Sequence, residues 1–322
     1  MRKYSVIIPV YNRPDEVDEL LASLTKQTYT NFEVLIIEDG SSNKCDEIVK
    51  KYEHQLELFY FYKENSGQGF SRNFGFERAK GEYFIVFDSD CLIPEYYFEN
   101  VENYLNEYQL DAFGGPDMAH ESFTNVQKAI SYSMTSVFTT GGIRGSKKSI
   151  GTFHPRSFNM GISKEVYAKT KGYKITRMGE DIELSIRIIE NGFKVGLIEN
   201  ASVYHKRRTN FMQFFKQLHF FGRARINISR FYKKELKLVH TFPALFTIGI
   251  MVYFCSYFFQ PLLFSAGSVL LGVFTLLIGV DATIKNKNLV VGLLSIIASF
   301  TQLIAYGVGF ISEGSIKVFS RK

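Results

Sequence analysis

The chain of 322 residues is long enough for about two domains with a full core. Its formal net charge is +6, and 46% of its residues are apolar, with 31 Phe, 19 Tyr and no Trp. The three cysteines, Cys45, Cys91 and Cys255, form no CxxC pair, which excludes a small disulfide scaffold and is typical of a reducing compartment.

The N-terminal region predicts a strand, a turn and a helix. Residues 5–10 form a short apolar run, a turn follows at 11–14, and apolar side chains recur with a helical period over 15–27. No signal-peptide pattern lies before the strand, so we expect the first 240 residues to stay on the cytoplasmic side of a membrane.

Strands and helices then alternate along the chain. Strands are predicted at 32–37, 56–62 and 83–87, and helices at 45–54 and 67–79. This alternation favours an α/β fold with a parallel sheet and helices on both faces. The first strand is not followed by G-x-G-x-x-G, and the sequence contains no G-x-x-x-x-G-K-[ST]. A classical dinucleotide fold and a P-loop are therefore both disfavoured.

Polar residues directly follow three of these strands, in the clusters 11–14, 38–42 and 88–90. Ligands of such sheets bind beyond the carboxyl ends of the strands, so the three clusters predict one site. Asp88 and Asp90 end an apolar strand, where a carboxylate is costly to bury unless a cation accompanies it. Carboxylate oxygens suit Mg²⁺ or Mn²⁺ with a bound diphosphate, but a solvated turn would have the same pattern.

Two later clusters contain candidate site residues. Glu180 and Asp181 begin a predicted helix, where an acid serves either as a cap or as a functional group. His205 follows a short apolar run and is either a core histidine or a metal ligand. The three cations at 206–208 have the composition of a phosphate clamp.

The region between these clusters offers weaker candidates. Residues 141–149 form a glycine-rich basic segment, which predicts a solvated surface loop or a gate over a bound donor. His120 and His154 are either ordinary polar loop residues or groups on the acceptor side of the site.

The C-terminal third is strongly apolar. Residues 241–280 and 288–312 contain no charged side chain, which predicts membrane spans near 242–260, 263–281 and 289–311. The alternative is a very apolar soluble helical domain. Lys285 and Lys287 suit a cytoplasmic loop, but three full spans would place the basic C-terminus outside. The third segment is therefore either re-entrant, or the number of spans differs from three.

A basic, aromatic segment at 211–234 precedes the first span. Its composition is typical of a helix at the surface of an anionic membrane, although an amphipathic helix on the soluble domain would look similar. We accordingly expect a catalytic domain at 1–210, an interfacial helical segment at 211–240 and a membrane domain at 241–322.

Several of these stretches together resemble family 2 glycosyltransferases, which are inverting enzymes of GT-A fold. The matching stretches are S-V-I-I-P-V-Y-N-R (5–13), V-L-I-I-E-D-G-S-S (34–42), N-S-G-Q-G-F-S-R-N-F-G (65–75), F-D-S-D (87–90), N-M before a glycine (159–160) and G-E-D-I-E-L-S-I-R (179–187). The basic helix and the apolar tail, including G-R-A-R (222–225) and Y-G-V-G-F (306–310), resemble bacterial members that build exopolysaccharides or lipid-linked glycans.

The resemblance implies a role for each matching residue. Nucleotide binding falls to Pro9, Tyr11, Asn12, Glu38, Asp39, Arg72 and Asp88, with Asp39 at the uracil base and Asp88 at the ribose. Asp90 and His205 would hold Mg²⁺ or Mn²⁺, and Asp181 would be the catalytic base. Asn159, Glu180, Arg207 and Arg208 fall on the donor or acceptor side. Many members have a second Asp where this chain has Glu38, so the role of Glu38 stays open.

The resemblance also implies a function. We expect an inverting, metal-dependent transfer of one sugar from a UDP-sugar to a polyprenyl-diphosphate-linked glycan at the cytoplasmic membrane, with no nucleic-acid partner. The chain has no Trp, so it lacks the Gln-x-x-Arg-Trp stretch of processive members. Three alternatives are a polyprenyl-phosphate glycosyltransferase, a nucleotidyltransferase and a non-catalytic nucleotide-binding scaffold.

Overall fold

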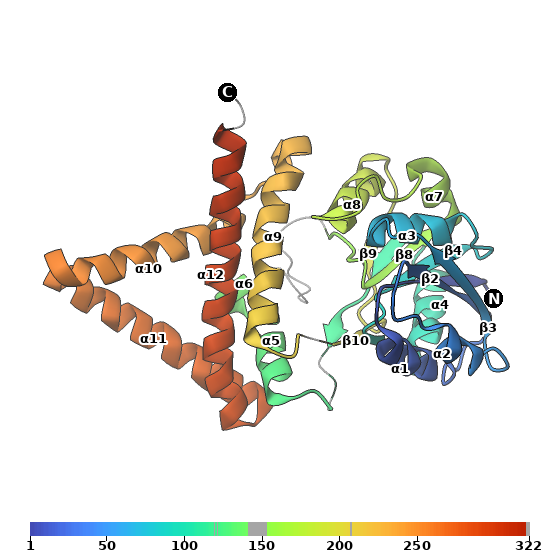
Figure 1. The fold of residues 1–322 in the computed structure, drawn as a ribbon, viewed down its shortest axis with the longest axis horizontal. Helices are drawn as coiled ribbons and strands as arrows, with labels where there is room; N and C mark the ends of the chain where they lie inside the picture. Colours follow the sequence, from blue (N-terminus) through green and yellow to red (C-terminus); the bar gives the residue numbers. More distant parts are fainter. Residues whose placement is uncertain (119, 121, 141–152, 207, 320–322) are drawn as a thin grey trace. The chain divides into compact units, whose positions relative to one another are not determined.

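The computed structural model describes residues 1–118, 120, 122–140, 153–206 and 208–319. They form two compact units (Figure 1). The first unit contains β1 (Tyr4–Val10), α1 (Pro14–Leu24), β2 (Phe32–Asp39), α2 (Asp46–Lys50), β3 (Glu57–Lys63), α3 (Gln68–Phe76), β4 (Tyr83–Phe87), β5 (Cys91–Leu92), α4 (Tyr97–Glu107), β6 (Ala112–Gly114), β7 (Asp117–Met118), β8 (Asn159–Ser163), α7 (Lys164–Thr170), α8 (Glu180–Glu190), β9 (Val195–Leu197) and β10 (Val203–His205). The second unit contains α5 (Asn125–Thr135), α6 (Val137–Thr140), α9 (Phe211–Phe231), α10 (Phe242–Phe259), α11 (Pro261–Asn286) and α12 (Leu289–Phe319).

A seven-stranded sheet in the order β3-β2-β1-β4-β8-β6-β9 organises the first unit. Strands β1 to β4 are parallel, as the alternation of strands and helices predicts, whereas β8 runs antiparallel to both of its neighbours. A second sheet joins β5, β10 and β7. Because β10 pairs with β5 directly after the strand end of β4, the second sheet brings the 203–205 segment beside Asp90.

The central strands β1, β2 and β4 of the large sheet are buried on both faces. Successive side chains of a strand point to opposite sides of the sheet, so each strand contributes to two cores. Val6, Ile8 and Val10 of β1 lie in the same core cluster as the leucines of α1. Ile7 of β1 lies in a second cluster with Phe76 of α3. The carboxyl ends of β1, β2 and β4 therefore end in loops supported by helices from both sides.

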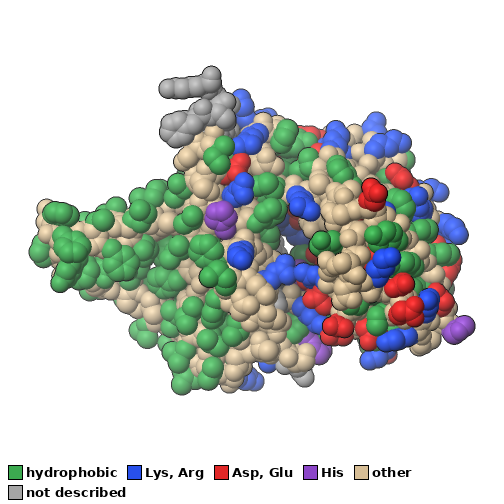
Figure 2. All heavy atoms as spheres, viewed as in Figure 1, with side chains coloured by type: hydrophobic (Ala, Val, Ile, Leu, Met, Phe, Trp, Pro, Cys, Tyr) green, Lys and Arg blue, Asp and Glu red, His purple; other side chains and the backbone are tan. Residues whose placement is uncertain are grey.

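The second unit is built around α12, which packs against α9, α10, α11 and α5. By length and composition, three helical segments could cross a membrane: Leu238–Phe259, Pro261–Asn286 and Leu289–Ile316. Apolar side chains cover the visible surface of α10 and α11 (Figure 2). The third apolar segment is one unbroken helix, α12, from Leu289 to Phe319.

Helix α9 begins where the basic aromatic segment is predicted, and it packs its apolar face on α12 within the second unit. Phe214 and Leu218 lie in one core cluster with Ala298 and Ala305 of α12. Glu313 of α12 forms ion pairs with Arg223 (Nε to Oε2, 3.0 Å) and Arg230 (Nη2 to Oε1, 2.7 Å) of α9. The arginines of α9 thus bind a carboxylate of α12 as well as supplying positive charge.

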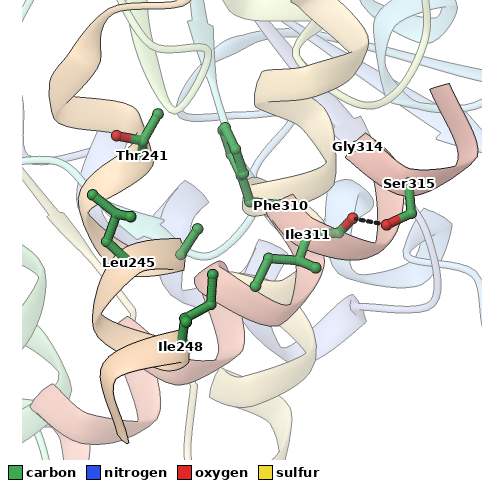
Figure 3. A pocket seen from close by; sticks show the side chains of 8 residues that line it. Thr241, Leu245, Ile248, Phe310, Ile311, Gly314 and Ser315 are labelled. Atoms are coloured by element: carbon green, nitrogen blue, oxygen red, sulfur yellow. Dashed lines mark hydrogen bonds between the residues drawn. The ribbon is translucent and has the colours of Figure 1, made fainter. Parts of the chain in front are cut away.

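An apolar groove lies between α10 and α12 (Figure 3). Ala244, Leu245 and Ile248 line it from α10, and Phe310 and Ile311 line it from α12. Thr241, Gly314 and Ser315 complete its lining, which includes no charged side chain. This lining suits the apolar surroundings of a membrane interior.

Close backbone contact between α9 and α12 yields a stability prediction. A Cβ added at Gly222 would lie 2.1 Å from the Tyr306 carbonyl oxygen, whereas one added at Gly249 would meet no atom within 4 Å. We expect Gly222→Ala to destabilise the second unit by about 1–3 kcal/mol through overpacking. Gly249→Ala, the matched control, is expected to keep or raise stability because alanine favours helices. Melting temperatures in detergent that are equal for the two variants would contradict this packing.

Candidate functional site

The loop after β1 is fastened to the loop after β2. Asn12 adopts a left-handed backbone conformation with φ of 55°, which asparagine tolerates better than most residues. Its side-chain Oδ1 accepts hydrogen bonds from the backbone N–H groups of Ser42 and Asn43, both at 2.9 Å. Pro9 is half-buried in β1, and Tyr11 is 54% exposed. The predicted nucleoside loop is thereby tied to the segment that follows Asp39.

Asp39 ends β2 as a buried carboxylate with several donors around it. Lys63 Nζ donates to Oδ1 at 2.7 Å, and the backbone N–H groups of Ser66 and Gly67 donate to Oδ1 and Oδ2 at 2.9 Å. Burial alone would raise the pKa of Asp39, but these hydrogen bonds outweigh it and lower the pKa below its usual value. Asp39 is therefore an ionised acceptor at the carboxyl edge of the sheet.

Glu38, next to Asp39, points into the interior. Its side chain is fully buried, with Oε1 accepting a hydrogen bond from the Ser41 hydroxyl and Oε2 accepting one from the Cys45 N–H at 2.8 Å. These bonds fix the turn between β2 and α2. Glu38 thus shapes the loop around Asp39 from inside.

Arg72 of α3 connects two acidic clusters that are far apart in sequence. Its guanidinium is buried and contacts Asp88 Oδ1 at 2.7 Å and Glu180 Oε1 at 3.5 Å. It also lies over the Tyr173 ring at 5.4 Å from the centroid. Burial alone would lower the pKa of Arg72, but Tyr173 and the two carboxylates hold it above its usual value. Arg72 therefore stays cationic and brings α8 to the strand end that carries Asp88.

Asp90 and His205 meet at the junction of the two sheets. His205 Nε2 lies 3.0 Å from Asp90 Oδ1 and 4.0 Å from Asp88 Oδ2. The His205 ring stacks on Phe158 with centroids 4.9 Å apart, which fixes its orientation. Arg13 Nη1 contacts the other oxygen of Asp90, Oδ2, at 2.8 Å. The two residues expected to bind a metal thus lie side by side.

The donor atoms around Asp90 fit a divalent cation. Ligand atoms of Asp90, Cys91 and His205 all lie within 4.8 Å of one another. Burial raises the pKa of the Cys91 thiol well above its usual value, so sulfur is the poorest ligand of the three. A carboxylate oxygen together with an imidazole nitrogen suits Mn²⁺, while Mg²⁺ relies more on oxygen.

Asp181 lies in the first turn of α8, which the chain enters through Gly179 at φ of 100°. Its side chain is 19% exposed, and Arg156 Nη1 lies 3.4 Å from Oδ2. The residue before Arg156 is braced against α8, because the Ser185 hydroxyl donates to the Pro155 carbonyl at 3.1 Å. Asp181 therefore keeps access to solvent with a cation beside it.

Glu180, the neighbour of Asp181, is buried. Gln68 Nε2 donates a hydrogen bond to Glu180 Oε1, the oxygen that also faces Arg72. Burial raises the pKa of Glu180, and the charge of Asp181 adds to the rise, while Arg72 opposes it. The two adjacent acids thus differ in environment, one enclosed and one open.

The three remaining candidates are Asn159, Arg208 and Arg207. Asn159 is fully buried in β8, where Tyr97 OH donates to its Oδ1 at 2.6 Å and its Nδ2 donates to the Ala201 carbonyl at 2.8 Å. Arg208 is half-exposed and belongs to the second unit. Arg207 lies outside the described residues. Asn159 therefore acts on the strand framework with both of its polar groups.

The weaker sequence candidates are only partly described. His120 makes an edge contact with the Tyr204 ring, with centroids 4.8 Å apart. His154 is half-buried in the segment before β8. The expected basic loop at 141–149 lies outside the described residues.

Sequence reasoning missed three cations of this site: Arg13, Lys63 and Arg156. Lys63 ends β3 and Arg13 follows β1, so their positions at strand ends were a usable signal. Arg156 precedes β8 with no motif around it. Its pairing with Asp181 is a long-range contact that local patterns do not carry.

Comparison with known proteins agrees with this geometry. Residues 5–169 match the family model described as Glycosyl transferase family 2. The minor teichoic acid biosynthesis protein GgaB of Bacillus subtilis (strain 168) is 27% identical over 211 residues, covering 64% of this chain and 23% of GgaB. Poly(ribitol-phosphate) beta-N-acetylglucosaminyltransferase TarS of Staphylococcus aureus (strain Mu50) is 36% identical over 115 residues, covering 34% of this chain and 20% of TarS. The matched regions thus span less than a quarter of either relative's length.

Two solved structures share the fold. The mannosyltransferase PcManGT from Pyrobaculum calidifontis, in complex with GDP-Man and Mn²⁺, superposes with a TM-score of 0.68 at 14% identity, covering 98% of this chain and 88% of that one. S. aureus TarS 1–349 in complex with UDP-GlcNAc gives a TM-score of 0.51 at 18% identity, covering 97% and 92%. These likenesses support the expected GT-A architecture. Because the family model covers half of the sequence, the chain belongs to glycosyl transferase family 2.

Proposed function

We propose that this chain transfers one sugar from a nucleotide sugar to a hydroxyl group of a lipid-linked saccharide. The observation that carries the proposal is the position of Arg72, which contacts both Asp88 and Glu180. Through Arg72 the acids expected at the nucleotide and the helix that carries Asp181 belong to one site. A site for nucleotide alone would not need the second cluster.

The donor is proposed to be a UDP-sugar. Asp39 offers an ionised carboxylate at the edge of the sheet, which suits the N–H of a uracil ring. TarS was solved with UDP-GlcNAc and PcManGT with GDP-Man, so the family fold accommodates more than one base. The uracil assignment thus depends on Asp39.

A divalent cation, Mn²⁺ or Mg²⁺, is part of the proposal. Asp90 and His205 would hold it. When bound, such a cation neutralises charge on the departing nucleoside diphosphate. PcManGT was solved with Mn²⁺, which is consistent with this assignment.

Asp181 is proposed as the general base. The acceptor hydroxyl attacks the anomeric carbon from the face opposite the diphosphate, the bond to the diphosphate breaks, and the hydroxyl proton passes to the Asp181 carboxylate. One displacement inverts the anomeric configuration. The exposure of Asp181 supports this role, because a base must reach the acceptor, whereas Glu180 is enclosed.

The acceptor and the membrane location are inferred from the second unit. The second unit has three apolar helices long enough to span a bilayer. Such helices would hold the catalytic unit at the membrane, where a lipid-linked acceptor lies. We propose that residues 1–210 are the catalytic domain facing the cytoplasm, that 211–240 connects it to the membrane surface, and that 241–322 is the membrane domain.

The function is tested by identifying the product. Detergent-solubilised full-length protein is incubated with UDP-sugars, Mn²⁺ and extracted membrane lipids, and the lipid product is analysed by mass spectrometry and NMR. A sugar added to a diphosphate-linked saccharide through a glycosidic bond of inverted configuration supports transfer to a saccharide hydroxyl. A single sugar on a lipid monophosphate would instead mean that the acceptor is polyprenyl phosphate.

The nucleoside assignment predicts a loss of affinity on replacing Asp39. Asp39→Asn is expected to weaken UDP binding by about 10–100-fold, because a hydrogen bond to a charged group is worth about 1.5–3 kcal/mol. Glu77→Gln, an exposed carboxylate on the same unit, is the control and should bind UDP as the wild type does. Isothermal titration calorimetry measures both, and equal affinities would remove Asp39 from the nucleotide site.

A further inference from the structure

Asp90 already has a cation of the chain itself as a partner. Arg13 Nη1 lies 2.8 Å from Asp90 Oδ2, while His205 Nε2 lies 3.0 Å from Oδ1. The Asp90 side chain is only 8% exposed, so solvent screens this pair weakly. A divalent cation that used Asp90 would therefore meet the positive charge of Arg13 at the same carboxylate.

The position of the Arg13 side chain allows it to leave Asp90. Its side chain is 33% exposed, and it also contacts Glu16 Oε2 at 2.9 Å from the first turn of α1. The backbone of Arg13 is held, because its carbonyl accepts a hydrogen bond from the Val17 N–H at 3.2 Å. Only the Arg13 side chain needs to move, and it can stay paired with Glu16 as it does so.

We propose that Arg13 is a resident counterion of the metal carboxylate, which passes to the donor diphosphate when metal and nucleotide arrive together. The inference rests on the proposed function. Without ligand, Arg13 neutralises Asp90 and competes with a free divalent cation. With a diphosphate present, Arg13 gains a new anionic partner and leaves Asp90 to the metal.

The chemistry of Arg13 fits a diphosphate as its second partner. A guanidinium presents a planar fork of N–H donors that matches phosphate oxygens, and its charge is permanent. Arg13 directly follows the loop of Tyr11 and Asn12, expected to line the nucleoside. Asp88, beside Asp90 and 34% exposed, adds negative charge that disfavours a diphosphate without cations. Arg13 and the metal would together offset this repulsion.

Reciprocal coupling is the measurable consequence. If Arg13 leaves Asp90 more readily when a diphosphate is bound, a nucleoside diphosphate must tighten metal binding, and the metal must tighten nucleotide binding by the same factor. Any site that binds a metal and a diphosphate together shows some of this coupling. The contribution of Arg13 can be recognised because Arg13 weakens binding of the metal when no nucleotide is present.

The test measures Mn²⁺ affinity without turnover. Free Mn²⁺ is titrated by electron paramagnetic resonance against the detergent-solubilised full chain, with and without UDP, for the wild type, Arg13→Met, Arg13→Gln and Arg13→Lys. Arg78→Met is the control, since it removes one positive charge from an exposed site in the turn that follows α3. Melting temperatures confirm that each variant is folded, and Arg13→Gln serves as a second neutral variant.

Removing the charge of Arg13 is expected to tighten binding of Mn²⁺ alone by about fivefold or more, the lower end of typical couplings between linked sites. In the neutral Arg13 variants, UDP should then raise the affinity for Mn²⁺ by a smaller factor than it does in the wild type. Arg13→Lys keeps the charge and should bind Mn²⁺ alone as the wild type does, and so should Arg78→Met.

Two outcomes overturn the inference and differ in what they say of the function. If both neutral Arg13 variants bind Mn²⁺ alone no more tightly than the wild type, while UDP still tightens Mn²⁺, Arg13 is no counterion and the proposed transferase stands. If wild-type protein binds Mn²⁺ but UDP neither binds nor changes that affinity, the inference and the proposed donor both fail.

Discussion

Replacing Asp181 with asparagine is expected to lower kcat by about 10²–10⁴-fold, the usual contribution of a general base. Asparagine keeps the shape of the side chain but accepts no proton, so the acceptor hydroxyl loses its proton acceptor. UDP affinity should not change, because the Asp181 carboxylate contacts Arg156 and the backbone N–H of Ile182 rather than the nucleotide loops. Single-turnover rates together with UDP titration measure the two quantities separately.

The control for Asp181→Asn lies on the same helix. Glu190 is exposed at the far end of α8, and Glu190→Gln should keep wild-type activity. Glu180→Gln is the more informative comparison, because Glu180 is the adjacent acid with the raised pKa. Full activity in Asp181→Asn combined with loss in Glu180→Gln would reassign the base to Glu180.

Replacing Arg72 with methionine is expected to destabilise the first unit strongly. Methionine fills much of the arginine volume but leaves Asp88 and Glu180 without their shared cation. Breaking a buried pair by removing one partner costs about 3–5 kcal/mol. The lower end applies here, because Asp88 is one-third exposed and water screens part of its charge. At about 2–4 °C per kcal/mol, the melting temperature should fall by roughly 6–12 °C.

Arg78→Met, two residues after the end of α3, is the matched control for Arg72→Met. Arg78 is exposed and lies over the Phe74 ring at 3.4 Å from the centroid, so its loss should cost only about 0.5–1 kcal/mol. The same melting temperatures are also measured at lower pH, because protonation of Glu180 removes the repulsion between carboxylates that the loss of Arg72 creates. The difference in melting temperature between Arg72→Met and the wild type should therefore become smaller at low pH. Equal melting temperatures for the two arginine variants would mean that Arg72 does not hold the clusters together.

The architecture of the first unit was predictable because its signals are local. The apolar runs 5–10, 32–37 and 83–87 became β1, β2 and β4, each ending within two residues of the predicted limit. Since parallel strands share a carboxyl edge, the sequence alone predicts that the polar residues after them lie in one region. The three C-terminal apolar segments were equally predictable from the sequence, because length and absence of charge define a candidate span.

Partners of individual side chains were not predictable in the same way. Glu38 and Asp39 are adjacent, yet alternation along β2 sends Glu38 into the interior and leaves Asp39 at the edge. Asn159 resembled a site residue, but its two polar groups bond to the Tyr97 hydroxyl of α4 and to the Ala201 carbonyl between β9 and β10. The partners of Asn159 are tens of residues away in sequence, and those of Glu38 lie in the turn after β2, so the strand period predicts neither set of contacts.

The place of helix α5 in the second unit was also not predictable from local patterns. Helix α5 lies between β7 and β8 in sequence, yet it packs on α12 with the C-terminal helices. Tyr132 of α5 donates a hydrogen bond to Asp281 of α11 at 2.6 Å. A boundary drawn where composition changes does not reveal that a segment of the preceding region belongs to the apolar helices.

The proposed sugar transfer is tested most simply by assaying nucleotide release. Detergent-solubilised protein is incubated with UDP-, GDP- and dTDP-sugars and Mn²⁺ or Mg²⁺, and the freed nucleoside diphosphate is assayed with Asp181→Asn alongside. We expect release from one UDP-sugar that requires the metal, rises with a lipid-linked saccharide acceptor and falls to background in the variant. Equal release by Asp181→Asn, or no release and no stabilisation by any nucleotide with acceptor present, would exclude Asp181-dependent transfer.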